Sequence, residues 1–166
     1  MKKILLAILL FSTGSIAFSQ GTISKGGSQI NLGAGFSDWG VPIYLGFDCG
    51  VAKDFTLGAE ASYRSYRENW HYDYYRQSII GFSGNGNYHF NSVLALPSAF
   101  DFYAGLNIGF YIWSSPDGYH GDHSSGLGIG GQVGGRYFFT NKLALNLEFG
   151  GGNAFSQGKI GLTFRR

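Results

Sequence analysis

The sequence alternates apolar and non-apolar residues with a period of two through most of its length. Ile43, Leu45 and Phe47, for example, are each separated by one residue of a different character. Successive side chains of a β-strand point to opposite faces, so this period predicts strands with one apolar face, and no helical period competes with it. Eight segments follow the pattern, at residues 30–36, 41–51, 55–64, 80–90, 101–112, 127–139, 143–150 and 159–165. The pattern restricts the chain to an all-β architecture of eight consecutive strands.

The composition indicates one folded domain with an unusual surface. Charged residues make up 13% of the 166 residues, about half the share of roughly 25% found in soluble domains. Glycine occurs 28 times, proline only three times, and 44% of the residues are hydrophobic, which argues against a disordered chain. The single cysteine excludes an intramolecular disulfide and a cysteine-rich zinc site. The chain therefore has too few charges to coat a surface that faces water.

Residues 1–19 have the features of a cleaved secretory signal peptide. Two lysines precede an apolar run at residues 4–11, which is too short to span a bilayer as a helix. Ala17 and Ser19 supply the small residues of a cleavage site. We therefore expect export and a mature barrel domain of residues 20–166.

The charge of the mature chain is balanced. Loss of the two signal-peptide lysines leaves ten basic residues against ten acidic ones, which gives no reason to expect nucleic-acid binding. No cysteine follows the cleavage site, so a lipoprotein anchor is not expected. No later run approaches 18 apolar residues, so the sequence predicts no transmembrane helix.

The connections between the predicted strands alternate in length. Tight turns at residues 53–54 and 140–142 lie on the same side as a longer link at residues 91–98. On the opposite side we expect long polar loops at residues 67–76 and 114–125, and short ones at 37–40 and 153–156. An even antiparallel strand count places both termini on the side of the short turns. This arrangement is typical of an up-and-down barrel with short periplasmic turns and longer extracellular loops.

Alternation alone does not say which face points outward. A soluble lipocalin-like barrel places the apolar face inside, and a membrane barrel places it outside, in lipid. Three features favour the membrane barrel: the other face is mostly Gly, Ser, Asn and Gln, its few charges balance, and aromatic residues gather near strand ends. The charges are Asp48, Glu60, Asp101 and Glu148 against Arg64, Arg136, Lys159 and Arg165. The aromatic residues are Phe36, Trp39, Tyr63, Tyr88, Phe90, Tyr111, Trp113, Tyr137 and Phe139.

We therefore predict an all-β fold, an eight-stranded antiparallel up-and-down transmembrane β-barrel. The apolar residues of the alternating segments should then face lipid, because the lumen of so narrow a barrel is filled by the other face. The residues chosen to represent this face are Leu45, Phe47, Leu106, Ile108, Val133 and Leu147.

Three stretches carry a resemblance to a known family. They are the signal ending at residues 17–20, the run Leu-Pro-Ser-Ala-Phe-Asp-Phe-Tyr-Ala-Gly at residues 96–105, and a last strand with Lys159, Gly161 and Phe164. The chain resembles the small eight-stranded outer-membrane barrels of the OmpX and OmpA-transmembrane-domain type, most of all the small porin-like barrels of Bacteroidota. The last strand resembles the assembly signal of that family, except that Arg166 stands where a terminal aromatic residue is usual.

The resemblance implies a location and a set of partners. The location is the outer membrane of a Gram-negative-type bacterium. The implied partners are outer-membrane lipid, lipopolysaccharide and the barrel assembly machinery, and the chain is expected to be a monomer.

The inward-facing charges are the first candidate site. They are expected to form a network that closes the lumen, because an eight-stranded interior is normally filled by side chains. The network comprises Asp48, Glu60, Arg64, Asp101, Arg136, Glu148 and Lys159. The alternative is an ion path lined by Glu60, Arg64, Glu148 and Lys159.

The long loops are the second candidate site. Their aromatic residues could bind an extracellular protein or glycan, although the same residues suit an aromatic girdle in contact with lipopolysaccharide. The loop residues are Trp70, His71, Tyr72, Tyr74, Tyr75, His120 and His123. Asp117 and Asp122 add possible metal ligands, but their spacing matches no fixed metal site, and no metal or cofactor is expected.

Catalysis is not expected. In the family that the chain resembles, lipid A-modifying enzymes use Ser, His and an acidic residue. His123 and Ser124 are adjacent and would point to opposite faces of a strand, His71 lies near Asp73, and no oxyanion-hole motif is recognisable. We expect a structural or surface-interaction role. The alternatives are a soluble lipocalin-like ligand-binding barrel and a lipid A-modifying enzyme.

Overall fold

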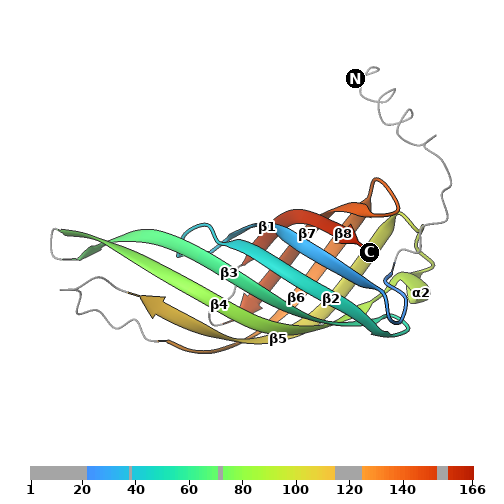
Figure 1. Cartoon of the computed structure of the whole chain (residues 1–166), viewed down its shortest axis with the longest axis horizontal. Helices are drawn as coiled ribbons and strands as arrows, with labels where there is room; N and C mark the ends of the chain where they lie inside the picture. Colours follow the sequence, from blue (N-terminus) through green and yellow to red (C-terminus); the bar gives the residue numbers. More distant parts are fainter. Residues whose placement is uncertain (1–21, 38, 71–72, 115–124, 153–156) are drawn as a thin grey trace, which may run out of the picture.

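The computed structural model is a closed, all-antiparallel barrel of eight strands in chain order, as Figure 1 shows. The structure describes residues 22–37, 39–70, 73–114, 125–152 and 157–166. The strands are β1 (Ser28–Phe36), β2 (Ile43–Ala52), β3 (Phe55–Trp70), β4 (Asp73–His89), β5 (Phe100–Ser114), β6 (Gly126–Phe138), β7 (Leu143–Gly152) and β8 (Gly158–Arg165). Each strand pairs with its neighbours in the sequence, and β1 pairs with β8 to close the sheet. The predicted fold class is confirmed.

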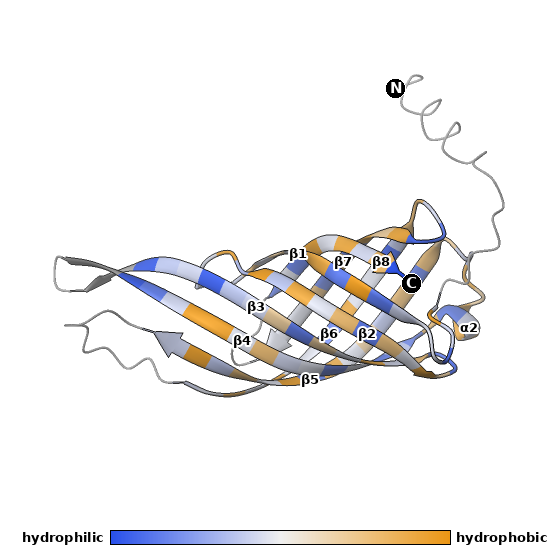
Figure 2. Ribbon diagram, in the orientation of Figure 1, coloured by the Kyte–Doolittle hydropathy of each residue, from blue (hydrophilic) through white to orange (hydrophobic). Residues whose placement is uncertain are grey.

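The apolar face of every strand points outward. Figure 2 shows hydrophobic and hydrophilic residues alternating along the strands. Leu106 and Leu147 are 71% and 45% exposed, whereas polar residues such as Asn107 and Asn146 are buried inside. All six residues expected to face lipid are exposed: Leu45, Phe47, Leu106, Ile108, Val133 and Leu147. The lipocalin-like alternative is wrong, because it requires these side chains inside the barrel.

The two ends of the barrel differ. At one end, here called the turn end, short turns join β2 to β3 and β6 to β7, and a longer link joins β4 to β5. At the other, the loop end, β1 joins β2, β3 joins β4, β5 joins β6 and β7 joins β8. No helix in the described part of the chain has the length and apolarity needed to cross a membrane.

The predicted long loop at residues 67–76 is wrong for most of its length. β3 and β4 continue as a paired ribbon from Arg67, opposite Arg76, to Trp70, opposite Asp73, and Figure 1 shows this hairpin projecting beyond the neighbouring strands. Alternation ends before residues 67–76 because no apolar face is required beyond the neighbouring strands. The backbone hydrogen bonds continue there, and Tyr and Trp favour strands. The strand β4 likewise begins earlier than the predicted residue 80.

The turn end contains a feature that periodicity did not predict. One helical turn, α2 (Asn91–Leu94), lies in the link between β4 and β5 and ends at Ala95 with φ 49°. Four residues are too few for a helical period to be visible in the sequence. Asp54, at φ 62°, sits in the tight turn before β3 and accepts a hydrogen bond from Ser92 Oγ at 2.7 Å. These contacts hold the turn-end connections against one another.

The segment before β1 folds across the turn end. Ile23 is 3% exposed, the Gly26 amide donates to the Gly50 carbonyl at 2.8 Å, and the Gly50 amide donates to the Gly27 carbonyl at 3.0 Å. A Cβ added at Gly50 would collide with the Ser24 carbonyl, so the close approach requires glycine. Residues 22–27 therefore help to cover this end of the barrel. The predicted signal peptide lies outside the described residues and stays a prediction.

Candidate functional site in the barrel interior

Arg136 of β6 binds two carboxylates in the half of the interior nearer the turn end. Its Nη1 donates to Asp101 Oδ2 at 3.1 Å and its Nη2 to Asp48 Oδ2 at 3.2 Å. Asp48 lies on β2, four strands from β6 in either direction, so this ion pair crosses the lumen. These three residues, the Arg136 cluster, have side chains no more than 3% exposed. A buried ion pair with this geometry holds opposite walls together.

Neutral groups complete the Arg136 cluster. Asp48 Oδ2 also accepts hydrogen bonds from Gln29 Nε2 at 2.9 Å and Asn31 Nδ2 at 2.8 Å. The Arg136 guanidinium lies 4.2 Å from the centre of the Tyr103 ring, a cation–π contact. The partners come from β1, β2, β5 and β6, so the cluster ties half of the strands into one network.

Lys159 of β8 is the centre of a second cluster, nearer the loop end. Its Nζ lies 2.8 Å from both carboxylate oxygens of Glu60 and 3.0 Å from Glu148 Oε1. Lys159 also lies 5.2 Å from the centre of the Tyr44 ring. We call Lys159, Glu60 and Glu148 the Lys159 cluster; it connects β8, β3 and β7 across the lumen.

Tyr103 joins the two clusters. Its hydroxyl donates to Glu148 Oε2 at 2.8 Å and lies 3.1 Å from Asn146 Oδ1, while its ring stacks on Arg136. A Cβ added at Gly134 would collide with the Tyr103 ring, so glycine at this position makes room for it. Tyr103 is 2% exposed and fills the middle of the barrel.

A third group in the interior is a chain of three residues, of which the sequence analysis singled out only Asp101. Thr56 Oγ1 lies 3.0 Å from His89 Nε2, and His89 Nδ1 lies 2.6 Å from Asp101 Oδ1. The order resembles a hydroxyl–imidazole–carboxylate relay, but His89 and Asp101 are fully buried, Thr56 is nearly so, and both ring nitrogens of His89 are engaged. The signal available in the sequence was the place of His89 on the polar face, two residues from Asn87.

Arg64 is the one member of the predicted network that joins neither cluster. It is 2% exposed, and its Nε and Nη1 have no hydrogen-bond partner in the structure. The other six predicted residues form the Arg136 and Lys159 clusters. Among the described arginines of the interior, Arg64 lacks partners at two nitrogens, whereas Arg136 lacks one only at Nε and binds carboxylates through both terminal nitrogens.

The candidate loop residues lie mostly outside the described part of the chain. This holds for His71, Tyr72, His120 and His123, and for the neighbouring Asp117 and Asp122. The backbones of Trp70, Tyr74 and Tyr75 belong to the β3–β4 hairpin. Within the described ranges, no three His, Cys, Asp or Glu residues are grouped so that they could hold a metal ion.

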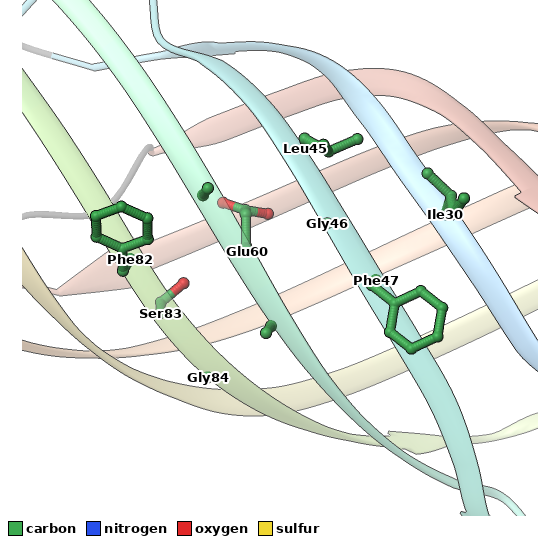
Figure 3. A pocket seen from close by; sticks show the side chains of 10 residues that line it. Ile30, Leu45, Gly46, Phe47, Glu60, Phe82, Ser83 and Gly84 are labelled. Atoms are coloured by element: carbon green, nitrogen blue, oxygen red, sulfur yellow. The ribbon is translucent and has the colours of Figure 1, made fainter.

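The outer wall has an apolar groove across β1 to β4, with a volume of about 550 Å³ (Figure 3). Ile30, Leu45, Phe47 and Phe82 stand around it, and small residues lie between them. Glu60 lies on the strand behind the groove, but its carboxylate binds Lys159. The groove belongs to the apolar belt of the barrel rather than to the charged interior.

Comparison with known proteins supports the fold and not a sequence family. The sequence matches no protein-family model and no curated protein sequence. The outer membrane protein OprG from Pseudomonas aeruginosa matches with a TM-score of 0.68 and 11% identity, over 89% of this chain and 99% of that chain. Neisserial surface protein A matches with a TM-score of 0.56 and 13% identity, over 84% and 92% of the two chains. Ail from Yersinia pestis matches with a TM-score of 0.54 and 11% identity, over 86% and 100%.

The TM-scores and coverages show a shared fold, and identities of 11–13% show nothing beyond it. The closed barrel, its apolar outer face and its polar interior define an eight-stranded transmembrane β-barrel of the outer-membrane type. The resemblance to small outer-membrane barrels is confirmed at the level of the fold, and the outer membrane is the location that this fold indicates. The expected link to Bacteroidota barrels finds no support in the comparisons.

Proposed function

We propose that this chain is a monomeric outer-membrane protein whose interior is closed to solutes and whose role is structural or lies in surface interaction. The observation that carries the proposal is the Arg136–Asp48 ion pair, which joins opposite strands at 3.2 Å with both side chains buried. An eight-stranded barrel has an interior just wide enough for side chains to fill. An ion pair that crosses the lumen of such a barrel leaves no straight path for a hydrated ion.

The rest of the interior supports closure. Beyond the two charged clusters, Gln132 donates to Asn87 Oδ1 at 2.6 Å and accepts from Asn107 Nδ2 at 2.7 Å. Thr163 donates to Asn31 Oδ1 at 2.7 Å on the other side of the lumen. Polar groups that are buried and bonded to one another form a packed core rather than the wall of an aqueous pore.

The outer surface supports contact with lipid. Aromatic rings are packed in a band near the turn end, with ring centroids 5.0–5.5 Å apart, between Phe55 and Tyr88, Tyr88 and Phe90, Phe100 and Tyr137, and Tyr137 and Phe139. Aromatic residues are enriched where a barrel meets the membrane interface. The proposed partners are therefore outer-membrane lipid and lipopolysaccharide, with insertion by the assembly machinery through Lys159, Gly161 and Phe164. An extracellular protein or glycan is the proposed partner of the loops.

Planar-bilayer recording of the refolded chain tests the closure. We expect no steady conductance from the unmodified chain. The double variant Asp48→Ala/Arg136→Ala lacks the ion pair across the lumen and should show channel openings. Lys142→Ala changes an exposed cation in the β6–β7 turn and serves as the matched control. Steady conductance of the unmodified chain equal to that of the double variant would contradict a closed interior.

A further inference from the structure

Three aromatic rings from three parts of the chain meet at the loop end of the barrel. Trp39 lies between β1 and β2, Tyr66 on β3 and Trp113 on β5. The Trp39 and Trp113 rings are 5.5 Å apart, and the Tyr66 and Trp113 rings are 6.3 Å apart, both in edge-to-face geometry. All three residues are half-buried, and we call them the loop-end collar.

Arg64 is buried on the inner face of β3, close in register to two residues of the collar. It is opposite Ile79 of β4, and Ile79 is opposite Trp113 of β5, so these three residues occupy one row of the wall. Tyr66 is two residues nearer the loop end on the same strand, which places it on the same inner face. Two rings of the collar, those of Trp113 and Tyr66, therefore lie near Arg64 on the inner wall, one in its row and one nearer the loop end.

The ring of Tyr111 lies on the other side of Arg64. A Cβ added at Gly81 would meet two carbons of that ring at 3.5 Å, and Gly81 is opposite both Ser62 and Tyr111, two residue pairs nearer the turn end than Arg64 and on the same inner face. Arg64 therefore lies between two levels of aromatic side chains.

Arg64 has no counter-ion among the described residues. Glu60 is the nearest carboxylate along β3, but both of its oxygens bind Lys159 Nζ at 2.8 Å, and Glu148 binds the same nitrogen. Within the described residues no carboxylate lies within ion-pair distance of Arg64, and its Nε and Nη1 are unpaired. An unpaired buried charge is unfavourable, and an anion from outside the chain would remove the penalty.

We propose that Arg64 and the loop-end collar form a binding site for a small organic anion: a carboxylate carried on a ring. The guanidinium would bind the carboxylate through charge-assisted hydrogen bonds, and the rings of Trp39, Tyr66 and Trp113 would pack against the body of the ligand. Ligand sites commonly combine aromatic walls with a few placed polar groups. The same chemistry is offered by a free aromatic acid and by an acidic sugar of a glycan. The proposal does not depend on the closed interior, because the site lies on the loop side of the Lys159 cluster.

The experiment is a titration of the full refolded chain in detergent micelles with two probes, benzoate and glucuronate. Binding is followed by calorimetry and by tryptophan fluorescence, since two of the three tryptophans stand in the collar. Benzyl alcohol lacks the charge and acetate lacks the ring, and both should bind at least tenfold more weakly than the probe that binds. Binding of benzoate alone identifies a free aromatic acid, and binding of glucuronate identifies an acidic sugar.

The variants separate the site from general charge effects. Arg64→Gln should weaken binding at least tenfold, and Trp113→Leu should weaken it while Arg64 is still present. Arg67→Gln removes an exposed cation three residues away on the same strand and should bind as the unmodified chain does. Heat-modifiability on gels shows that each variant is folded.

Three results would overturn the proposal. The first is that neither probe binds the unmodified chain. The second is that Arg64→Gln binds within twofold of it. The third is that acetate binds as tightly as benzoate and glucuronate. If Arg64→Gln does not fold, the Trp113→Leu result and the acetate comparison decide the question alone.

Discussion

Two buried arginines in one lumen have opposite surroundings. Arg136, towards the turn end, uses both terminal nitrogens on Asp101 and Asp48 and stacks on Tyr103. Arg64, towards the loop end, is equally buried, and no described carboxylate binds it; its Nε and Nη1 lack partners, whereas only Nε does so in Arg136. A buried charge with partners helps to hold the walls together. A buried charge without partners destabilises the fold unless a ligand binds it. The carboxylates described in the interior thus pair with Arg136 and Lys159, and the anion site proposed above lies at Arg64, on the loop side of both clusters.

The largest effect is expected from removing the paired arginine. Arg136→Met leaves Asp48 and Asp101 buried without their cation, and breaking a buried pair in this way destabilises by about 3–5 kcal/mol. Urea unfolding of the refolded barrel in lipid bilayers measures the loss. Arg64→Gln is the matched variant, and it should be neutral or stabilising. Equal losses in the two variants would remove the distinction between the halves of the interior.

A charge placed on the outer face should be nearly as damaging. Leu106 is 71% exposed on the lipid side of β5. If it lies near the bilayer midplane, Leu106→Arg should reduce the free energy of unfolding by about 2–4 kcal/mol, because an unpaired cation then meets hydrocarbon. The same measurement with Leu106→Ala separates the charge from the lost side chain. A neutral result in lipid would mean that this face does not meet the hydrocarbon.

A smaller effect is expected at the junction of the two clusters. Tyr103→Phe keeps the ring on Arg136 but removes the hydroxyl that donates to Glu148. A hydrogen bond to a charged group contributes about 1.5–3 kcal/mol. The free energy of unfolding of this variant should therefore lie between that of the unmodified chain and those of Arg136→Met and Leu106→Arg. Tyr137→Phe, on the outer wall, changes a hydroxyl at the membrane interface and should have little effect on unfolding in the same lipid. A loss as large in Tyr137→Phe would show that the interior hydroxyl has no special role.

The sequence predicted the barrel well because lipid imposes a regular pattern. Wherever one face must be apolar, alternation marks the strand and the residues that share a face, as it does from Ile43 to Val51. The pattern stops above the membrane, so the continuation of β3 and β4 to Trp70 and Asp73 was missed. Hydrogen bonding between two strands needs no apolar face, and the sequence carries no mark of where it ends.

The sequence predicted which charged residues face the interior, but not which of them bind one another. Alternation places Asp48, Arg64 and Arg136 on the inner face. The pairs that form depend on distances across the lumen of a closed barrel. Arg136, for example, binds Asp48, which lies 88 positions away in the sequence. Strand tilt and shear set those distances, and neither is visible in a single strand. The sequence therefore could not show that no described carboxylate would lie within ion-pair distance of Arg64, or that His89 would bind Asp101.

The last prediction concerns the loops, where the smallest effect on stability is expected. Removing residues 67–76 takes away a paired ribbon above the barrel, since Arg67 and Arg76 are opposite each other and the remaining ends can be joined by a tight turn. Removing residues 115–124 as well shortens the second predicted loop. Both changes leave the clusters of Arg136 and Lys159 and the apolar belt intact, so insertion, heat-modifiability and the free energy of unfolding should be unchanged. If the chain acts through its surface, an adhesion or outer-membrane integrity assay should show that the shortened barrel has lost that activity. A shortened barrel with the full phenotype would mean that the role is structural, because function carried on a rigid scaffold is expected in its loops.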